Sequence, residues 1–133
     1  SEQASFAMSY IARGLIPDGG GLYFLPRRVG LSRAKELIFT GRTVAPGEAE
    51  RINLIDRVVP HDALLPAAQD WALQLSAGSA TALGLSKSIL NNTFELTQGQ
   101  ISAMGSQAQG ICYTSSEHQE SVAAFLARKA QRS

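Results

Sequence analysis

Residues 14–30 have the sequence GLIPDGGGLYFLPRRVG, and the turn at their centre decides how this 133-residue chain must fold. Pro17 fixes one backbone angle, and the three glycines after Asp18 allow conformations and close approaches that a Cβ atom would prevent. Such a turn can bring the backbone next to a ligand. Because Asp18 lies just before an expected helix start, its carboxylate has two possible roles: a functional group, or the cap of that helix.

Two segments have the composition of short strands. Residues 6–12 (FAMSYIA) are apolar and aromatic, and residues 54–59 (LIDRVV) are rich in β-branched side chains and end at Pro60. A pair of short strands is marginal by itself in water, so we expect both to need further partners.

Helices are expected directly after the glycine turn. The first covers 21–29 and contains Pro26, which removes one helical hydrogen bond and should bend or shorten it. The second covers 33–40, with Ser32 as its N-cap and Gly41 as its C-terminal stop. Together with the turn, these helices account for most of the N-terminal part of the chain.

The remaining pattern is also helical. Pro46 suits the first turn of a short helix, and Asn53 can end it in the left-handed conformation. Apolar residues at helical spacing predict further helices over 62–76, 80–92, 98–113 and from Thr114 onward. Thr114 and Glu117 match a capping box for the last of these helices.

Composition excludes several classes of protein. Hydrophobic residues make up 44% of the chain and the formal net charge is +1, so we expect no nucleic-acid partner. No apolar run approaches the roughly 20 residues that a membrane span requires. Cys112 is the only cysteine, so no internal disulfide can form. We therefore predict a soluble, cytoplasmic protein with no membrane partner.

Motifs for metals and nucleotides do not match. His61 and His118 are far apart and have no acid or thiol at ligand spacing, so no metal site is expected. The glycine run lacks the Lys-Ser/Thr of a phosphate loop and the spacing of a dinucleotide fingerprint. Cys112 and Trp71 are interpreted as packing residues.

The order of the motifs is more specific than any one of them. Along the chain come FAMSYIARG, the PDGGG turn, LPRRVG, AKELIFTG and EAERINLIDRVVP, and later ALGLSKSILN and SSEHQESVAAFLARK. Together they resemble the crotonase family, the enoyl-CoA hydratases and isomerases. The resemblance covers essentially the whole chain and is strongest in residues 6–60.

The resemblance implies an α/β, crotonase-like (ClpP/crotonase) fold. This chain would be its C-terminal half, mostly helical with two or so short strands. Residues 1–60 would be the end of the crotonase core, and residues 61–133 a C-terminal helical oligomerisation region. In the family the backbone N–H groups of the oxyanion hole come from segments that precede this point, so we expect no turnover from the chain alone.

The resemblance also implies acyl-CoA thioester chemistry through a stabilised enolate, with no cofactor because coenzyme A enters as part of the substrate. Hydratases of the family usually place a glutamate where this chain has Tyr10. A phenol cannot replace that carboxylate as a base for water, which favours isomerisation over hydration. Asp18 corresponds to the proton shuttle of isomerase-like members. The substrate pocket would then contain Tyr10, Pro17, Gly19 and Gly20.

The last helix completes the predicted site. Phe125 and Arg128 resemble positions that contact the adenine and phosphates of CoA, commonly from a neighbouring subunit. The intact protein is accordingly expected to be a homo-oligomer, a trimer or a dimer of trimers. An alternative stays open: the chain is a catalytically inactive assembly fragment whose apolar helices and strand edges bind partners.

Overall fold

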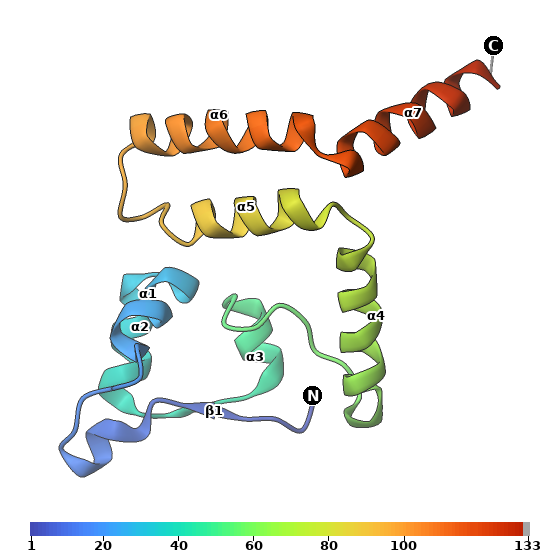
Figure 1. Cartoon of the computed structure of the whole chain (residues 1–133). Helices are drawn as coiled ribbons and strands as arrows, with labels where there is room; N and C mark the ends of the chain where they lie inside the picture. The colour runs from blue at the N-terminus through green and yellow to red at the C-terminus, as the bar shows by residue number, and fades with distance from the viewer. Residues whose placement is uncertain (132–133) are drawn as a thin grey trace. The chain divides into compact units, whose positions relative to one another are not determined.

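The computed structural model describes residues 1–131. By its internal contacts the chain divides into two compact units, Ser1–Gln69 and Asp70–Ser133. Figure 1 shows the elements of both units in chain order, coloured from the N-terminus to the C-terminus.

The first unit combines a two-stranded ribbon with short helices. Its elements are β1 (Phe6–Ala7), a 3₁₀ helix (Ser9–Arg13), α1 (Gly21–Val29), α2 (Leu31–Thr40), β2 (Thr43–Val44), α3 (Pro46–Arg51), a second 3₁₀ helix (His61–Ala63) and the first part of α4 (Leu64–Ser76). The two strands pair antiparallel, with Phe6 opposite Val44 and Ala7 opposite Thr43. The helices α1 and α2 pack against each other.

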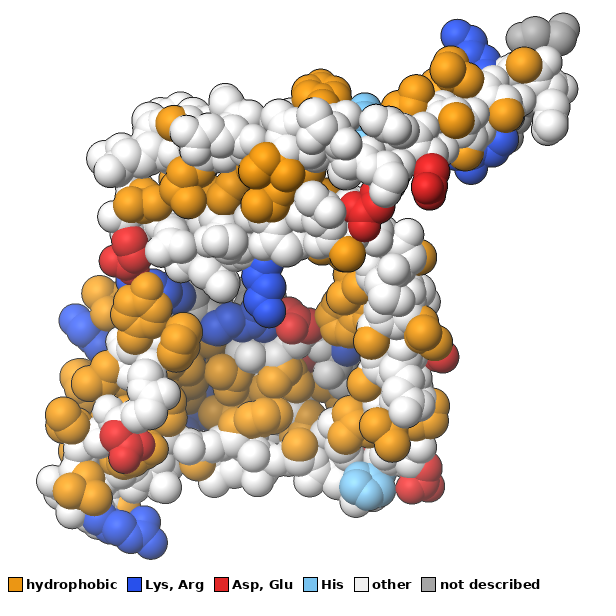
Figure 2. Space-filling view, viewed as in Figure 1, with side chains coloured by type: hydrophobic (Ala, Val, Ile, Leu, Met, Phe, Trp, Pro, Cys, Tyr) orange, Lys and Arg blue, Asp and Glu red, His pale blue; other side chains and the backbone are white. Residues whose placement is uncertain are grey.

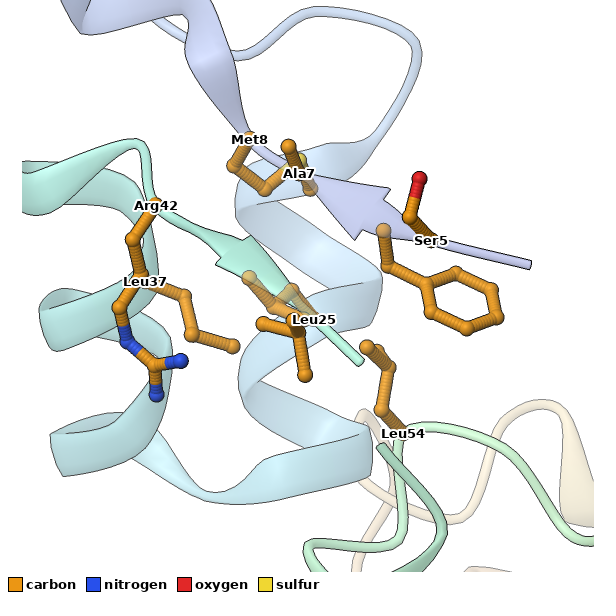
Figure 3. A pocket seen from close by; sticks show the side chains of 9 residues that line it. Ser5, Ala7, Met8, Leu25, Leu37, Arg42 and Leu54 are labelled. Atoms are coloured by element: carbon orange, nitrogen blue, oxygen red, sulfur yellow. The ribbon is translucent and has the colours of Figure 1, made fainter. Parts of the chain in front are cut away.

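A small apolar core holds this unit together. The buried residues are Leu25, Ala34, Leu37, Val44 and Ala49. They come from α1, α2, β2 and α3, so the four consecutive elements after the glycine turn contribute to one cluster. An open apolar pocket of about 360 Å³ adjoins the core (Figure 3), and its lining residues are Ser5, Phe6, Ala7, Met8, Leu25, Leu37, Arg42, Val44 and Leu54.

The glycine turn is shaped by sterics. Gly19 and Gly20 have φ values of 54° and 85°, in the left-handed region that favours glycine. A Cβ atom on Gly21 would lie 2.9 Å from Met8 Cε and 3.0 Å from Pro17 Cβ. A side chain at position 21 would therefore require the end of Met8 to move and Pro17 to shift slightly.

Arg42 links two helices of the first unit. Its guanidinium donates to both carboxylate oxygens of Glu48 on α3, at 2.9 and 2.6 Å, and its Nε donates to Glu36 on α2 at 3.0 Å. These hydrogen bonds from Arg42 hold the pKa values of Glu36 and Glu48 below their ordinary range. The carboxylates are therefore charged, and bound to Arg42, at neutral pH.

Both predicted strands require correction. Only Phe6 and Ala7 of 6–12 form a strand, because the chain turns into a 3₁₀ helix at Ser9. Residues 54–59 form no strand: the amides of Leu54 and Ile55 donate to the carbonyl of Ala49, and these two side chains pack on the core. The partner of β1 is β2, a strand at residues 43–44 that was not predicted.

Most helix boundaries agree with the prediction. Gly41 ends α2 in the left-handed conformation, Asn53 has φ 60°, and Pro46 is the first residue of α3. Ser32 as an N-cap is wrong: Gly30, with φ 79°, makes the bend between α1 and α2, and α2 starts at Leu31.

The second unit consists of helices. They are the rest of α4, α5 (Ala80–Leu90), α6 (Gln98–Thr114) and α7 (Ser116–Ala130). The helices α5 and α6 pack against each other, and α6 contacts α7. Among residues 70–131 no side chain is fully buried, in contrast to the first unit. None of the helices within residues 1–131 has the length and hydropathy needed to cross a membrane.

The start of α7 differs from the predicted capping box. Thr114 still belongs to α6, where its hydroxyl donates to the Ile111 carbonyl, and Ser115 is the N-cap of α7, accepting from the amide of His118 at 3.2 Å. A capping box does occur at α6, formed by Thr97 and Gln100.

Arg42→Gln should destabilise the first unit in a pH-dependent way. Because the pKa values of Glu36 and Glu48 are lowered on folding, their pairing with Arg42 contributes stability above their ordinary pKa of 4.5. That contribution is lost as the pH falls through the lowered values. In urea unfolding followed by circular dichroism, the difference between variant and wild type should be largest near pH 7 and should shrink below pH 4.5.

Lys35→Gln, on α2, is the control and should show no such pH-dependent difference. A constant difference between Arg42→Gln and wild type from pH 7 to pH 3 would contradict the role given to the ion pairs.

Candidate functional site

The side chains of Tyr10 and Asp18 are joined directly. The Tyr10 hydroxyl donates a hydrogen bond to Asp18 Oδ1 at 2.7 Å. Tyr10 is half-buried in the 3₁₀ helix Ser9–Arg13, and Gly14, with φ 67°, ends that helix so that the chain can return toward the glycine turn. The amide of Leu15 donates to the Tyr10 carbonyl at 3.1 Å and closes this short loop. The two predicted site residues are therefore positioned by adjoining elements.

The carboxylate of Asp18 changes the titration of the phenol. Its hydrogen bond and its negative charge both favour the neutral, protonated form of Tyr10, so the pKa of Tyr10 is raised above its ordinary value of 10. At neutral pH Tyr10 is a hydrogen-bond donor. It occupies one of the two oxygens of Asp18 and orients the carboxylate.

Asp18 does not cap α1 through its side chain. The N-cap of α1 is Gly20, which makes no side-chain cap, and the amide of Gly21 donates to the backbone carbonyl of Asp18 at 2.9 Å. Of the two roles that the sequence left open, capping is therefore wrong. The carboxylate is bound to Tyr10 instead.

The turn lies at the surface of the first unit. Pro17 is buried, whereas Asp18, Gly19 and Gly20 are exposed. Asp18 is also not among the residues that line the apolar pocket of Figure 3, where the guanidinium of Arg42 is held by Glu36 and Glu48. The first unit thus offers an oriented surface carboxylate that another surface must cover before it can act in a dry site.

The predicted CoA contacts lie on α7, in the second unit. Phe125 and Arg128 are three residues apart, so they share one face of the helix. The side chain of Phe125 is 60% exposed, and Val122 and Leu126 beside it are also exposed. Apolar side chains are visible along α7 in the space-filling view of Figure 2.

The two histidines and Cys112 make local contacts. His61 Nδ1 lies 3.0 Å from the Ser1 hydroxyl, and His118 contacts Tyr113 edge to face at 5.2 Å between ring centroids. Cys112 is a half-buried free thiol. Within residues 1–131, histidines, cysteines and acids form no group of three that could hold a metal ion.

One residue has a different role from the one that the sequence suggested. The carboxylate of Glu117 does not serve the start of its own helix but accepts hydrogen bonds at the start of α5, from residues 79–81. No local pattern could reveal a contact between residues almost forty positions apart.

The family follows from comparison with known proteins. The profile of the enoyl-CoA hydratase/isomerase family matches residues 1–132, and the chain belongs to this family. Its fold is accordingly the crotonase fold, represented here by helices and two short strands.

Several relatives are similar over nearly the whole chain. A protein of Mycobacterium bovis named "probable enoyl-CoA hydratase" is 34% identical over 130 residues, which are 98% of this chain and 51% of the relative. The crystal structure of an enoyl-CoA hydratase/isomerase from Cupriavidus metallidurans has a TM-score of 0.90 at 35% identity, covering 96% of this chain and 48% of that one.

A second similar structure contains a ligand. It is a putative enoyl-CoA hydratase from Thermobifida fusca in complex with acetoacetyl-CoA, with a TM-score of 0.78 at 33% identity over 82% of this chain and 43% of that one. The chain thus spans about half the length of the relatives described here.

The raised pKa of Tyr10 can be tested by spectrophotometric titration of the tyrosines. The absorbance change of Tyr10, obtained as the difference between wild type and Tyr10→Phe, should have its midpoint above pH 10. In the Asp18→Asn background the same difference should shift to lower pH, because the charge that opposes phenolate formation is gone. Equal midpoints in both backgrounds would show that Asp18 does not act on Tyr10.

Proposed function

We propose that this chain supplies the proton-transfer group of an enzyme acting on acyl-CoA thioesters through a stabilised enolate. The reaction is double-bond isomerisation rather than hydration, and Asp18 is the catalytic acid and base. The observation that carries the proposal is the hydrogen bond of 2.7 Å from the Tyr10 hydroxyl to Asp18. Family membership and the acetoacetyl-CoA in a similar structure support the thioester substrate.

The argument against hydration depends on Tyr10. A hydratase needs a second carboxylate to activate water, and this chain has a phenol at the position where the family resemblance places it. The pKa of Tyr10 is raised further by Asp18, so the phenol stays protonated near neutral pH and cannot accept a proton from water. Tyr10 instead orients Asp18, which alone shuttles the proton of the isomerisation.

The glycine turn would bring backbone and carboxylate close to the acyl chain. Gly19 and Gly20 present no side chain there, and Pro17 is fixed in the interior behind them. A general acid or base must come within about 3 Å of the proton that it moves. Covering the exposed turn with the remainder of the fold would also exclude water and strengthen the oxyanion hole.

The CoA part of the substrate is assigned to α7. Arg128 would pair with the phosphates and Phe125 would contact the adenine, from a neighbouring subunit of a trimer or dimer of trimers. The exposed apolar face of α7 supports a contact of this kind. No cofactor beyond the CoA of the substrate is required.

The chain would correspond to the C-terminal half of the family fold. Residues 1–60 would complete the crotonase core and residues 61–133 would form a helical oligomerisation region. The oxyanion-hole donors would come from the other half, so the chain alone should have no turnover. The cytoplasmic location stays a prediction that depends on the single cysteine.

A second candidate function is assembly without catalysis. It is favoured by the second unit, where no residue among 70–131 is fully buried and Leu90, Phe94 and Phe125 are largely exposed. Apolar surface of this extent marks an interaction site. If this reading is correct, light scattering of the purified chain should give a defined trimer or dimer, and a stable monomer would contradict it.

Asp18→Asn tests the catalytic proposal. In the chain joined to the N-terminal half of a relative, isomerisation of a 3-enoyl-CoA should fall by about 10²–10⁴-fold, the usual contribution of a general acid or base. Binding of acetoacetyl-CoA should persist, because the amide keeps the size of the carboxylate. The matched control is Asp70→Asn, at an exposed position outside the turn. An isomerase rate within about threefold of wild type would remove Asp18 from the mechanism.

A further inference from the structure

The start of α5 is capped by a residue from another helix. Glu117, on α7, accepts a hydrogen bond from the Ser79 hydroxyl and from the amides of Ala80 and Thr81, at 3.1 and 3.4 Å. The third amide of the helix, that of Ala82, donates to the Ser79 hydroxyl oxygen at 3.1 Å. The first-turn amides of α5 therefore depend jointly on Ser79 and on a carboxylate almost forty residues later.

Electrostatics favours this contact. The first turn of a helix presents unpaired N–H groups and the positive end of the helix dipole, both of which attract a carboxylate. Consistent with this, the pKa of Glu117 is lowered, chiefly by the hydrogen bond from Ser79. Hydrogen bonds to a charged acceptor are roughly twice as strong as neutral ones.

The contact between Glu117 and α5 lies at the first turn of α7, where it can influence the direction of that helix. Only Ser115 separates the end of α6 from the start of α7, and its hydroxyl both donates to the Cys112 carbonyl and accepts from the amide of His118. From Gln119 to Ala130 every residue of α7 is exposed. Besides its junction with α6, the first turn of α7 is thus joined to the start of α5 through Glu117.

We propose that Glu117 is a positioning residue for CoA binding: its contact with Ser79 and the first amides of α5 fixes the direction in which α7 carries Phe125 and Arg128. The inference rests on the proposed function for the role of these two residues in binding CoA. The contact of Glu117 itself does not depend on that function.

The geometry of a helix amplifies a loss of this contact. Arg128 lies eleven residues beyond Glu117 on α7, about 16 Å along the helix axis at 1.5 Å per residue. A tilt of about 20° at the first turn would therefore move Arg128 by about 6 Å. Misplacement of about 1 Å is enough to disturb a positioned contact, so the side chains could no longer meet phosphate and adenine together.

The test measures the direction of α7 in the full chain. Spin labels at Lys87→Cys on α5 and Ala124→Cys on α7, in a Cys112→Ala background, report the distance between the two helices by pulsed electron resonance. Glu117→Ala should broaden the distance distribution, whereas the control Glu120→Ala, on the same helix, should leave it as in wild type. An unchanged distribution in Glu117→Ala would overturn the proposal.

A second variant separates positioning from the stability of α5. Adding Ser79→Asp to Glu117→Ala replaces the neutral N-cap of α5 by a charged one, which returns a carboxylate to the start of α5 and should restore its helicity. The broad distance distribution should remain, because the carboxylate that joined α7 directly to α5 is still absent. Recovery of the narrow distribution in the double variant would show that Glu117 only caps α5, and would overturn the positioning role.

Binding of acetoacetyl-CoA supplies the functional readout. In the chain joined to the N-terminal half of a relative, if a tenth of the molecules keep the competent direction of α7, the dissociation constant should rise on the order of tenfold in Glu117→Ala and not in Glu120→Ala. Arg128→Ala should weaken the same binding. If Arg128→Ala has no effect while Glu117→Ala still broadens the distribution, the proposed CoA contact is wrong and the positioning of α7 by Glu117 is upheld.

Discussion

The close packing of Gly21 against Met8 and Pro17 is the constraint that seats α1 in the first unit. A Cβ atom there would lie 2.9 Å from Met8 Cε and 3.0 Å from Pro17 Cβ, so a larger residue would have to displace the end of Met8 and press on Pro17. With glycine, α1 starts against these two residues and directs Leu25 into the core beside α2 and β2.

The same turn connects fold and chemistry. The phenol of Tyr10 donates a hydrogen bond to Asp18 across the loop that precedes α1. The Asp18 carboxylate therefore does not cap the amides of α1. An acid oriented by a neutral donor, beside glycines that leave room for a ligand, is suited to moving a proton on carbon. On α7, Glu117 has a comparable supporting role, because it acts through the helix that carries the proposed CoA contacts.

Local signals predicted the features whose cause is local. Gly41 and Asn53 adopt left-handed conformations, and Pro46 starts a helix, because these residues act on their own backbone. The strand expected at 54–59 failed because its amides bond to the end of α3, which composition cannot reveal. Two hydrogen-bonded contacts were also not predicted: Tyr10 with Asp18, and Glu117 with α5. Both depend on how separate elements pack.

The most direct test of the central claim is a crystal structure of the chain, joined to the N-terminal half of a relative, with acetoacetyl-CoA bound. The account predicts a carboxylate oxygen of Asp18 about 3–3.5 Å from a reacting carbon of the acyl group, the separation of a near-attack arrangement, with Tyr10 still donating to its other oxygen. A carboxylate turned to solvent, with another acid beside the thioester, would contradict it.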